Sequence, residues 1–397
     1  MSRYVLRVIR TPQRVCFQTL IDSDTGIQPI LVSLWADHLS SSVRPNTAKA
    51  YLKDITCLLE WAKKTNIHLA DRFQRLEGLT HHEIRLLAES LHVKADGSTV
   101  RINTYNRRLI SIVNFINFHM ERCLESCDKT TNEMLVVGRR IQKINKYFGK
   151  LTKSAAEIGL DETPTANIAD LALERLLKIA HPLSKSNPYR YTATKIRNYC
   201  MILVSIECLL RRSELVLLEL NDFEDTTTPT LRVKQPSYQN QISTKDFASL
   251  KTHGRVLPIS RETASWLQSY VEDFRVVPST KRHLSVALFI SLATGKRLST
   301  GTANAYLKPL QQKYFQIYGD RIEVHSHMLR VTGANLKKRA AEEKLNDLPA
   351  LTRYMEVNEV MTYSGGWSPT SSMPRRYTRD HIASKTGPIA RSKKHDH

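Results

Sequence analysis

Six side chains in the second half of the chain have the chemical types that a metal-free attack on a phosphodiester requires. In chain order they are Arg211, Lys251, His327, Arg330, Trp367 and Tyr377. Such a reaction needs donors for the charge that grows on the phosphoryl oxygens, a nucleophile, and groups that accept and supply protons. Two guanidinium groups, an ammonium, an imidazole, an indole N–H and a phenol together provide these functions. None of the segments that carry them is informative alone, so the prediction depends on their combination.

The segment "LLRRSELVLLEL" places Arg211 near the start of a predicted helix, directly after an apolar run. Arginine presents a planar, permanently charged fork that suits phosphate oxygens. Glu214 follows one helical turn later and is placed to hold that guanidinium. The alternative is a surface Arg–Glu pair on an amphipathic helix, and Arg212 competes for the same role.

The segment "LKTHGRVLPIS" places Lys251 before a predicted strand, with a turn signal at Gly254. A flexible ammonium at the tip of a hairpin can donate a proton to the leaving 5′ oxygen of a DNA strand. The alternative is an ordinary loop lysine, and Lys245 is the nearest rival for this role.

The segment "HSHMLRVTGAN" places His327 and Arg330 three residues apart at the start of a predicted helix, so the two side chains share a face. Histidine can accept the proton of a nucleophile or bind a phosphoryl oxygen, and Arg330 adds a second fork. A structural histidine is the alternative. The segment has no acidic partner of the kind that a metal site would need.

The segment "GGWSPTSSMPRRYTR" places Tyr377 among basic residues, with Arg375 and Arg376 directly before it. Attack by a tyrosine oxygen forms a covalent phosphotyrosine, which conserves the bond energy, so rejoining needs no ATP. The indole N–H of Trp367 can only donate, either to a phosphoryl oxygen or within a core. A surface tyrosine is the alternative, and Tyr363 is the closest competitor.

The charge of the chain predicts a polyanionic partner. Lys and Arg number 59 against 38 Asp and Glu, which gives a net charge of +21. The basic residues do not accompany an apolar anchor, and no apolar run approaches the length of a membrane span. Nucleic acid is therefore the expected partner rather than a membrane, with a basic enzyme of unrelated function as the alternative.

The six cysteines contain no CxxC pair and no Cys/His finger spacing, so we expect no zinc site. Cys57, Cys200 and Cys208 lie in apolar helical contexts and are expected to be reduced thiols of the core. Cysteine use of this kind predicts a cytoplasmic protein.

The pattern of apolar residues divides the chain into four parts. Residues 1–27 predict a short strand or arm, and residues 28–148 a helical domain. Residues 149–168, rich in glycine, proline and small polar side chains, predict an interdomain linker. Residues 169–397 predict a mainly helical domain with a small antiparallel sheet near residues 229–260 and a flexible basic tail. The predicted fold class is mainly α, with a helical first domain and a mixed α+β second domain.

Basic side chains on the predicted helices indicate where DNA phosphates would be bound. One such helix is expected to begin with Asn46 or Thr47 as its cap. The alternative is the solvated face of a four-helix unit. The candidates are Lys49, Lys53, Arg101, Arg107 and Arg108, together with Arg375 and Arg376.

The order Arg, Lys, His-x-x-Arg, Trp and Tyr resembles the tyrosine recombinases of the phage integrase family. The segments around Arg211, around His327 and Arg330, and around Trp367 and Tyr377 are similar to the three boxes of that family. The helical segments of residues 28–148 are similar to its core-binding domain. Leu209 stands where the family usually has glycine, and the stretch from Arg330 to Trp367 is long.

The resemblance implies that two domains close around double-stranded DNA and that Tyr377 attacks the scissile phosphate. The products would be a 3′-phosphotyrosine and a free 5′ hydroxyl. It also implies a homo-tetramer on two duplexes, linked by exchange of the segments after Tyr377, and a monomer or dimer without DNA. No metal or nucleotide cofactor is expected, and the protein would act in the cytoplasm on the nucleoid.

Two other functions remain open from the residues. One is a topoisomerase of related type IB chemistry, which would relax supercoiled DNA as a monomer without site preference. The other is a catalytically silent relative that only binds DNA. The complete set of reactive groups argues against the silent relative, and the helical first domain favours a recombinase over a topoisomerase. Neither the target site nor the biological task can be predicted.

Overall fold

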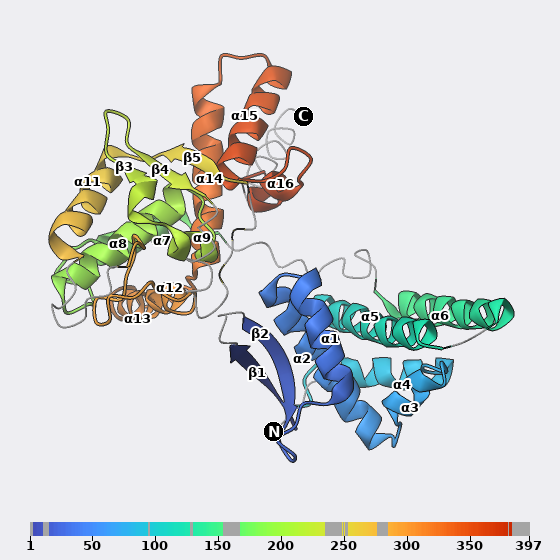
Figure 1. Ribbon diagram of the computed structural model, residues 1–397. Helices are drawn as coiled ribbons and strands as arrows, with labels where there is room; N and C mark the ends of the chain where they lie inside the picture. Colours follow the sequence, from blue (N-terminus) through green and yellow to red (C-terminus); the bar gives the residue numbers. More distant parts are fainter. Residues whose placement is uncertain are drawn as a thin grey trace. The chain divides into compact units, whose positions relative to one another are not determined.

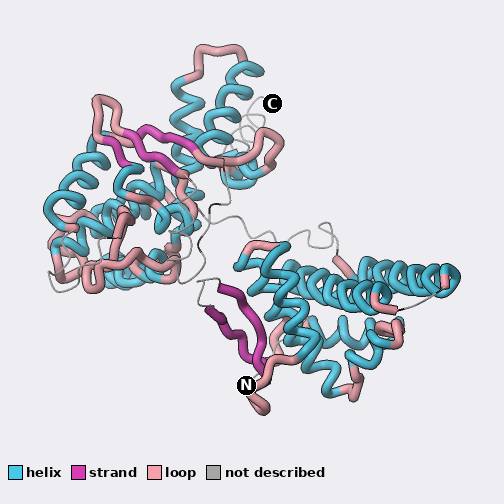
Figure 2. The backbone as a smooth tube through the Cα atoms, viewed as in Figure 1, coloured by secondary structure: helices cyan, strands magenta, loops and turns pink. Residues whose placement is uncertain are grey.

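The computed structural model describes residues 3–10, 16–93, 96–127, 130–153, 167–234, 248, 250, 253–275, 285–379 and 381–382 (Figures 1 and 2). The chain divides into two compact units, Met1–Glu162 and Thr163–His397. Among the described residues, no helix is both long enough and apolar enough to cross a bilayer.

The first unit begins with an antiparallel hairpin of β1 (Tyr4–Arg10) and β2 (Cys16–Asp22). The hairpin packs against the helices that follow it, and Leu20 of β2 is fully buried in the core of the unit. The segment predicted as an arm therefore contributes to this core.

In the described part of the first unit, six helices follow the hairpin. They are α1 (Ile30–Ser42), α2 (Pro45–Lys64), α3 (Leu69–Gln74), α4 (His81–Leu91), α5 (Ile102–Glu125) and α6 (Thr131–Leu151). The prediction that Asn46 or Thr47 caps a helix is wrong, because α2 starts at Pro45, whose fixed φ suits the first helical position. The last helix, α6, runs into the stretch predicted as linker.

The second unit is mainly helical, with a small sheet along one side (Figure 1). Its main helices are α7 (Asp170–Ala180), α8 (Thr192–Glu207), α9 (Arg212–Leu217), α11 (Arg261–Ser269), α13 (Leu307–Tyr318), α14 (Ser326–Lys344) and α15 (Ala350–Gly365). Short turns are η1 (Leu220–Asp222), η2 (Tyr270–Phe274), α12 (Thr302–Ala305) and α16 (Met373–Tyr377). The long stretch between Arg330 and Trp367 contains the rest of α14 and the helix α15.

The sheet of the second unit has the strand order β3–β4–β5 and is antiparallel. Its strands are β3 (Phe223–Glu224), β4 (Thr230–Val233) and β5 (Arg255–Pro258). The strands β4 and β5 lie where the sequence predicted the sheet.

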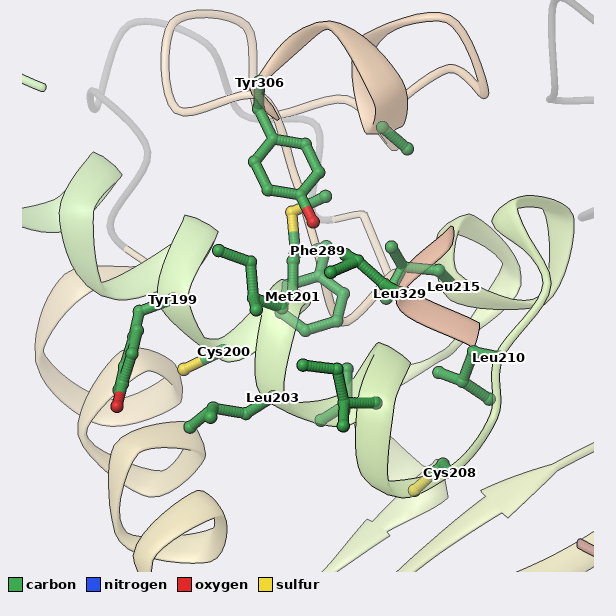
Figure 3. Packing of buried hydrophobic residues seen from close by; sticks show 14 of the residues in the cluster. Tyr199, Cys200, Met201, Leu203, Cys208, Leu210, Leu215, Phe289, Tyr306 and Leu329 are labelled. Atoms are coloured by element: carbon green, nitrogen blue, oxygen red, sulfur yellow. The ribbon is translucent and has the colours of Figure 1, made fainter. Parts of the chain in front are cut away.

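The core of the second unit surrounds α8, which is buried along most of its length. Figure 3 shows side chains of this core, among them Leu210, Leu215 and Leu329. Leu210 directly precedes Arg211, and Leu329 directly precedes Arg330, so the apolar anchors lie next to the predicted reactive residues. Burying these leucines fixes the backbone from which the charged side chains extend.

The helices α8 and α14 approach each other closely at Gly333. A Cβ atom at this position would lie 2.1 Å from the carbonyl oxygen of Ile206. Only glycine permits this approach, because any side chain would displace the backbone of α8. Gly333 thus brings the helix that carries His327 and Arg330 against the end of α8, where Arg211 follows.

Candidate active site

Glu214 is the centre of the site. Its side chain is fully buried and belongs to the first turn of α9, which begins directly after Arg211. The backbone N–H of Arg211 donates to Glu214 Oε2 at 2.9 Å, and Arg211 Nη1 donates to Oε1 at 3.3 Å. The prediction that Glu214 holds the guanidinium of Arg211 is confirmed.

Three arginines share the carboxylate of Glu214. Besides Arg211, Arg255 Nη2 lies 3.0 Å from Oε2, and Arg330 Nη1 lies 3.6 Å from the same oxygen. The side chain of Arg211 retains 24% exposure, whereas those of Arg255 and Arg330 are 1% and 0% exposed. These four groups carry a surplus of positive charge, which suits the binding of an anion.

Arg330 is held by backbone carbonyls of two other segments. Its Nη1 donates to the carbonyl of Leu209, and its Nη2 donates to the carbonyl of Gly365 at 2.9 Å. Burial, and after it the charge of Arg211, lower the pKa of Arg330 to about 10. The guanidinium is still protonated at neutral pH, so it presents a preorganised positive charge.

The carbonyl of Leu209 depends on an uncommon backbone conformation. Leu209 has φ of 49°, in the left-handed region where the family resemblance leads one to expect glycine. Such a conformation costs about 1–2 kcal/mol for a residue with a side chain. Its side chain is fully buried and packs with Val331, Trp367 and Tyr377. Packing therefore stabilises the turn that glycine would adopt more easily.

The turn after α15 places Trp367. Gly366 has φ of 62° and ends the helix. A Cβ atom on Gly365 would lie 2.3 Å from the Trp367 ring, so the indole lies flat on a glycine. The carbonyl of Gly365 faces the guanidinium of Arg330 and accepts a hydrogen bond from it. The Cζ atom of Arg330 is 5.0 Å from the centre of the Trp367 ring.

Tyr377, at the end of α16, packs against three other predicted site residues. Its ring centre is 5.3 Å from that of His327, 5.2 Å from that of Trp367, and 5.4 Å from Arg330 Cζ. Asn335 of α14 donates to its backbone carbonyl at 3.0 Å, and the residue is 7% exposed. The phenol thus lies beside both the imidazole and a buried guanidinium.

His327 is neutral at physiological pH. The residue is exposed, but desolvation by the groups packed around its ring lowers its pKa to about 4, helped by the positive charges of Arg330, His325, Arg211 and Arg376. A neutral imidazole has an unprotonated nitrogen that can accept a proton or a hydrogen bond.

Two buried donors of the site have no hydrogen-bond partner among the residues that the structure describes. They are Nε of Arg330 and Nε1 of the Trp367 indole. Buried N–H groups are normally paired, and an unpaired one is unfavourable by about 1–3 kcal/mol. Both donors belong to side chains that pack against Tyr377.

The structure separates the predicted residues from their rivals. Arg212 is exposed, whereas Arg211 binds Glu214. Tyr363 is 54% exposed, and its hydroxyl bonds to the backbone of Val256 in β5. Of the six predicted residues, five lie together. Lys251 and its rival Lys245 lie outside the described residues.

The predicted DNA-binding side chains have different environments. Lys49, Lys53 and Arg101 are exposed, as are Arg375 and Arg376. Arg107 is bound through Nε and Nη2 to both carboxylate oxygens of Asp54, and Arg108 donates to the carbonyl of Leu91. The exposed cations have the accessibility that phosphate contacts need. The assignment of all seven to DNA binding stays a prediction.

The sequence analysis missed Arg255 and the backbone acceptors of Leu209 and Gly365. Arg255 is the first residue of "RVLP" in β5, where alternation assigns it to the buried face. A charged residue in the inward register of a predicted strand was therefore an available signal. No sequence signal marked the carbonyls of Leu209 and Gly365, because every residue carries a backbone carbonyl.

Comparisons with known proteins identify the second unit. Residues 170–348 match the model of the phage integrase family. The fold is similar to that of the XerH site-specific recombinase bound to palindromic difH substrate in a post-cleavage complex, with a TM-score of 0.53 and 15% identity over 88% of this chain and 82% of that chain. A pre-cleavage complex of XerH with difH gives 0.52 and 15%, over 89% and 83%. A search of the curated proteins found no match.

These findings confirm the family predicted from the sequence, because residues 170–348 form a domain of the phage integrase family. The likeness to XerH shows a shared fold, which confirms the predicted mainly helical class with small antiparallel sheets. The match to the phage integrase family thus lies within the second unit, Thr163–His397.

Proposed function

We propose that this protein cuts and rejoins DNA strands at specific sites through a covalent 3′-phosphotyrosine on Tyr377. The observation that carries the proposal is the packing of the Tyr377 phenol against His327, Trp367 and Arg330, beside a carboxylate shared by three arginines. A phosphodiester bound there would meet a nucleophile, a proton acceptor and a surplus of positive charge.

In the proposed reaction the Tyr377 oxygen attacks phosphorus, and the bond from phosphorus to the 5′ oxygen breaks. The phenolic proton passes to neutral His327, whose pKa near 4 leaves its nitrogen free to accept it. Arg211 and Arg330 bind the phosphoryl oxygens, and the indole N–H of Trp367 donates to one of them. The free 5′ hydroxyl of a partner duplex then reverses these steps to join the strands.

Lys251 is assigned to protonate the leaving 5′ oxygen. The backbone N–H of His253, two residues later, donates to the carbonyl of Gly366 at 3.2 Å. The chain after Lys251 is therefore bound to the turn that carries Trp367, which supports this assignment over Lys245.

The test is a covalent adduct. Nicked duplexes taken from the DNA that flanks the gene are incubated with the protein and separated on denaturing gels. The nick lets the short strand downstream of the cleavage site diffuse away, so the phosphotyrosine accumulates. The wild type is expected to form an adduct, and Tyr377→Phe none, because the phenylalanine ring has no nucleophile.

Two further tyrosines serve as matched controls. Tyr354 is 70% exposed on α15, and Tyr354→Phe should retain the adduct. Tyr363→Phe tests the rival nucleophile. An adduct that survives in Tyr377→Phe and disappears in Tyr363→Phe would move the nucleophile to Tyr363. No adduct with the wild type, despite tight DNA binding, would favour the silent relative.

A second experiment separates recombination from relaxation. Two duplexes of different length, each with the target site, should yield joint molecules of recombinant length. Relaxation of a supercoiled plasmid that lacks the site, without any joint molecule, would instead favour the type IB topoisomerase.

We further propose that the active assembly is a homo-tetramer on two duplexes, acting in the cytoplasm on the nucleoid. A groove of about 1060 Å³ between α14, α15 and the residues around α16 offers room for a segment from a neighbouring protomer. It is lined by charged side chains, such as those of Lys338 and Glu342, and by apolar ones, such as those of Val357, Met361 and Pro374. Mass photometry with paired duplexes should show four protomers, and a stable dimer that still forms joint molecules would contradict this assembly.

A further inference from the structure

Arg255 occupies a position where an apolar residue is expected. Side chains of β5 alternate between the core and solvent, with Arg255 and Leu257 buried and Val256 and Pro258 exposed. A guanidinium in this register is stable only if its donors are paired, because burying an unpaired charge is strongly unfavourable. Its partners therefore indicate why the charge is present.

Among the described residues, Arg255 has partners on three separate segments. Its Nε donates to the carbonyl of Ser364 at the end of α15, at 2.9 Å. Its Nη2 donates to Glu214 Oε2 at 3.0 Å and approaches the carbonyl of Cys208, after α8, at 3.5 Å. One side chain thus connects the hairpin strand, the turn before Arg211 and the turn before Trp367.

Arg255 and Arg330 bind the same two turns one residue apart. Arg255 bonds to the carbonyls of Cys208 and Ser364, and Arg330 to those of the next residues, Leu209 and Gly365. Both also face Glu214 Oε2, but Arg255 lies at 3.0 Å and Arg330 at 3.6 Å. Arg255 therefore makes the closer contact with the oxygen that the two share.

We infer that Arg255 is a positioning residue for strand transfer, which acts through Glu214 and never touches the DNA. By binding Oε2 of Glu214 at 3.0 Å, Arg255 limits Arg330 to the longer contact of 3.6 Å with that oxygen, so the fork of Arg330 stays directed at the phosphate site. By binding the carbonyls of Cys208 and Ser364, Arg255 also fixes the backbone of the next residues, Leu209 and Gly365. The carbonyls of these two residues orient Arg330. The inference rests on the proposed function, in which Arg330 binds the scissile phosphate.

Replacing Arg255 should therefore slow the chemical step without weakening DNA binding. In Arg255→Met, Glu214 loses its contact with Arg255, and Arg330, now 3.6 Å from Oε2, moves closer to that oxygen. Single-turnover adduct formation at saturating protein should fall about hundredfold, as for loss of one preorganised donor. The dissociation constant for DNA should stay within about threefold, because Arg255 is buried and makes no phosphate contact. Arg255→Lys keeps the charge but lacks the fork, so about a tenfold loss is expected.

Arg297→Met is the matched control. Arg297 belongs to the same unit, its side chain is 6% exposed, and it donates to the carbonyl of Val216 while facing Glu219. Loss of this buried arginine tests a general weakening of the domain. Its adduct rate should stay within about threefold of the wild type at a temperature where both variants are folded.

Two readouts distinguish positioning from a structural role. In a Glu214→Gln background, Arg255→Met should add little to the defect, because residues that act through a shared group are not additive. A DNA substrate with a 5′-bridging sulfur has a leaving group that needs no proton, so it should restore cleavage to Lys251→Ala. It should not restore cleavage to Arg255→Met.

The inference is overturned if Arg255→Met cleaves at the wild-type rate, if Arg297→Met loses as much activity, if the two losses at Glu214 and Arg255 add, or if the sulfur substrate rescues Arg255→Met. Should Arg255→Met fail to fold, Arg255→Lys carries the same test, and a wild-type rate for it overturns the inference. A wild type that forms no adduct removes the proposed function together with the inference. If the wild type does form the adduct, a failed expectation for the Arg255 variants overturns the inference and leaves the proposed function intact.

Discussion

The two units each bury a carboxylate that binds arginine, but they differ in the balance of charge. In the first unit Asp54 of α2 is 2% exposed and accepts two hydrogen bonds of 2.9 Å from Arg107 of α5, with a third from Ser111. The second unit buries Glu214 to 1% exposure and surrounds it with three arginines.

This difference separates a pair that joins helices from a site that receives an anion. The contacts of Asp54 use one carboxylate for one guanidinium, and the Arg107 side chain remains 45% exposed, so its remaining charge is solvated. The cluster at Glu214 is deficient in negative charge, and the described part of the chain leaves two of the neighbouring donors unpaired. A phosphodiester would supply the missing charge.

The largest expected effect comes from removing each carboxylate. Glu214→Ala leaves buried guanidiniums without a counter-charge and should destabilise the second unit by about 3–5 kcal/mol. Asp54→Ala frees an arginine that can turn to water, so the first unit should lose only about 1–2 kcal/mol. Hydrogen exchange of peptides from α9 and α2 measures the two losses in the full chain. Equal losses would remove the distinction between the two clusters.

The second largest effect is expected when the guanidinium of Arg330 is replaced by an ammonium group. Arg330→Lys keeps a positive charge but cannot reach the carbonyls of Leu209 and Gly365 and a phosphate together. Adduct formation should fall about 10²–10³-fold, with little change in DNA affinity. The matched change Arg107→Lys in the first unit should leave the rate of adduct formation unchanged. A large loss there would show that the charge-balanced pair also supports the chemistry.

A smaller effect is expected from the indole N–H. Trp367→Phe keeps a ring beside Tyr377 but loses the donor, and adduct formation should fall about tenfold, as for one hydrogen bond to a charged group. Trp367→His retains an N–H and should recover most of this loss. If the phenylalanine variant keeps the wild-type rate, the indole only fills the core, as the alternative from the sequence had it.

The smallest expected effect compares two histidines whose pKa values both lie near 4. Burial is the largest cause of both low pKa values. Several positive charges of the site lower the pKa of His327 further, whereas Arg122 is the one charge that adds to the lowering at His119. Salt screens charges but not burial, so raising the ionic strength should raise the pKa of His327 and leave that of His119 nearly unchanged. Proton NMR of the imidazole rings measures both.

The same two pKa values give the sign of the pH dependence of stability. Each histidine binds its proton more weakly when folded than when unfolded, so the unfolded chain binds more protons between about pH 4 and 6.5. Stability should therefore rise with pH across this window and be lost as the pH falls through it. His119→Phe should flatten the curve for the first unit, and an unchanged curve would contradict its buried neutral state.

Much of the site could be predicted because its reactive groups are of uncommon types in a specific order. Arg211 at a helix start, the shared face of His327 and Arg330, and Tyr377 among arginines follow from local spacing. The helices of the second unit and the pair β4 and β5 followed from periodicity in the same way. The cap of α2 was mistaken, because Pro45 outweighs the capping side chains that come after it.

The sequence by itself determined which chemistry the chain can perform, since covalent structure sets the charge, the donors and the nucleophile of each side chain. Only the tertiary structure decided which residues of each type lie together in the site. Arg211 lies there rather than Arg212, and Tyr377 rather than Tyr363. The structure also added Arg255, which the sequence had not indicated. The reason is that these choices depend on burial and on backbone carbonyls, such as those of Leu209 and Gly365, that lie more than a hundred residues apart in the chain. No local pattern records a contact of that kind.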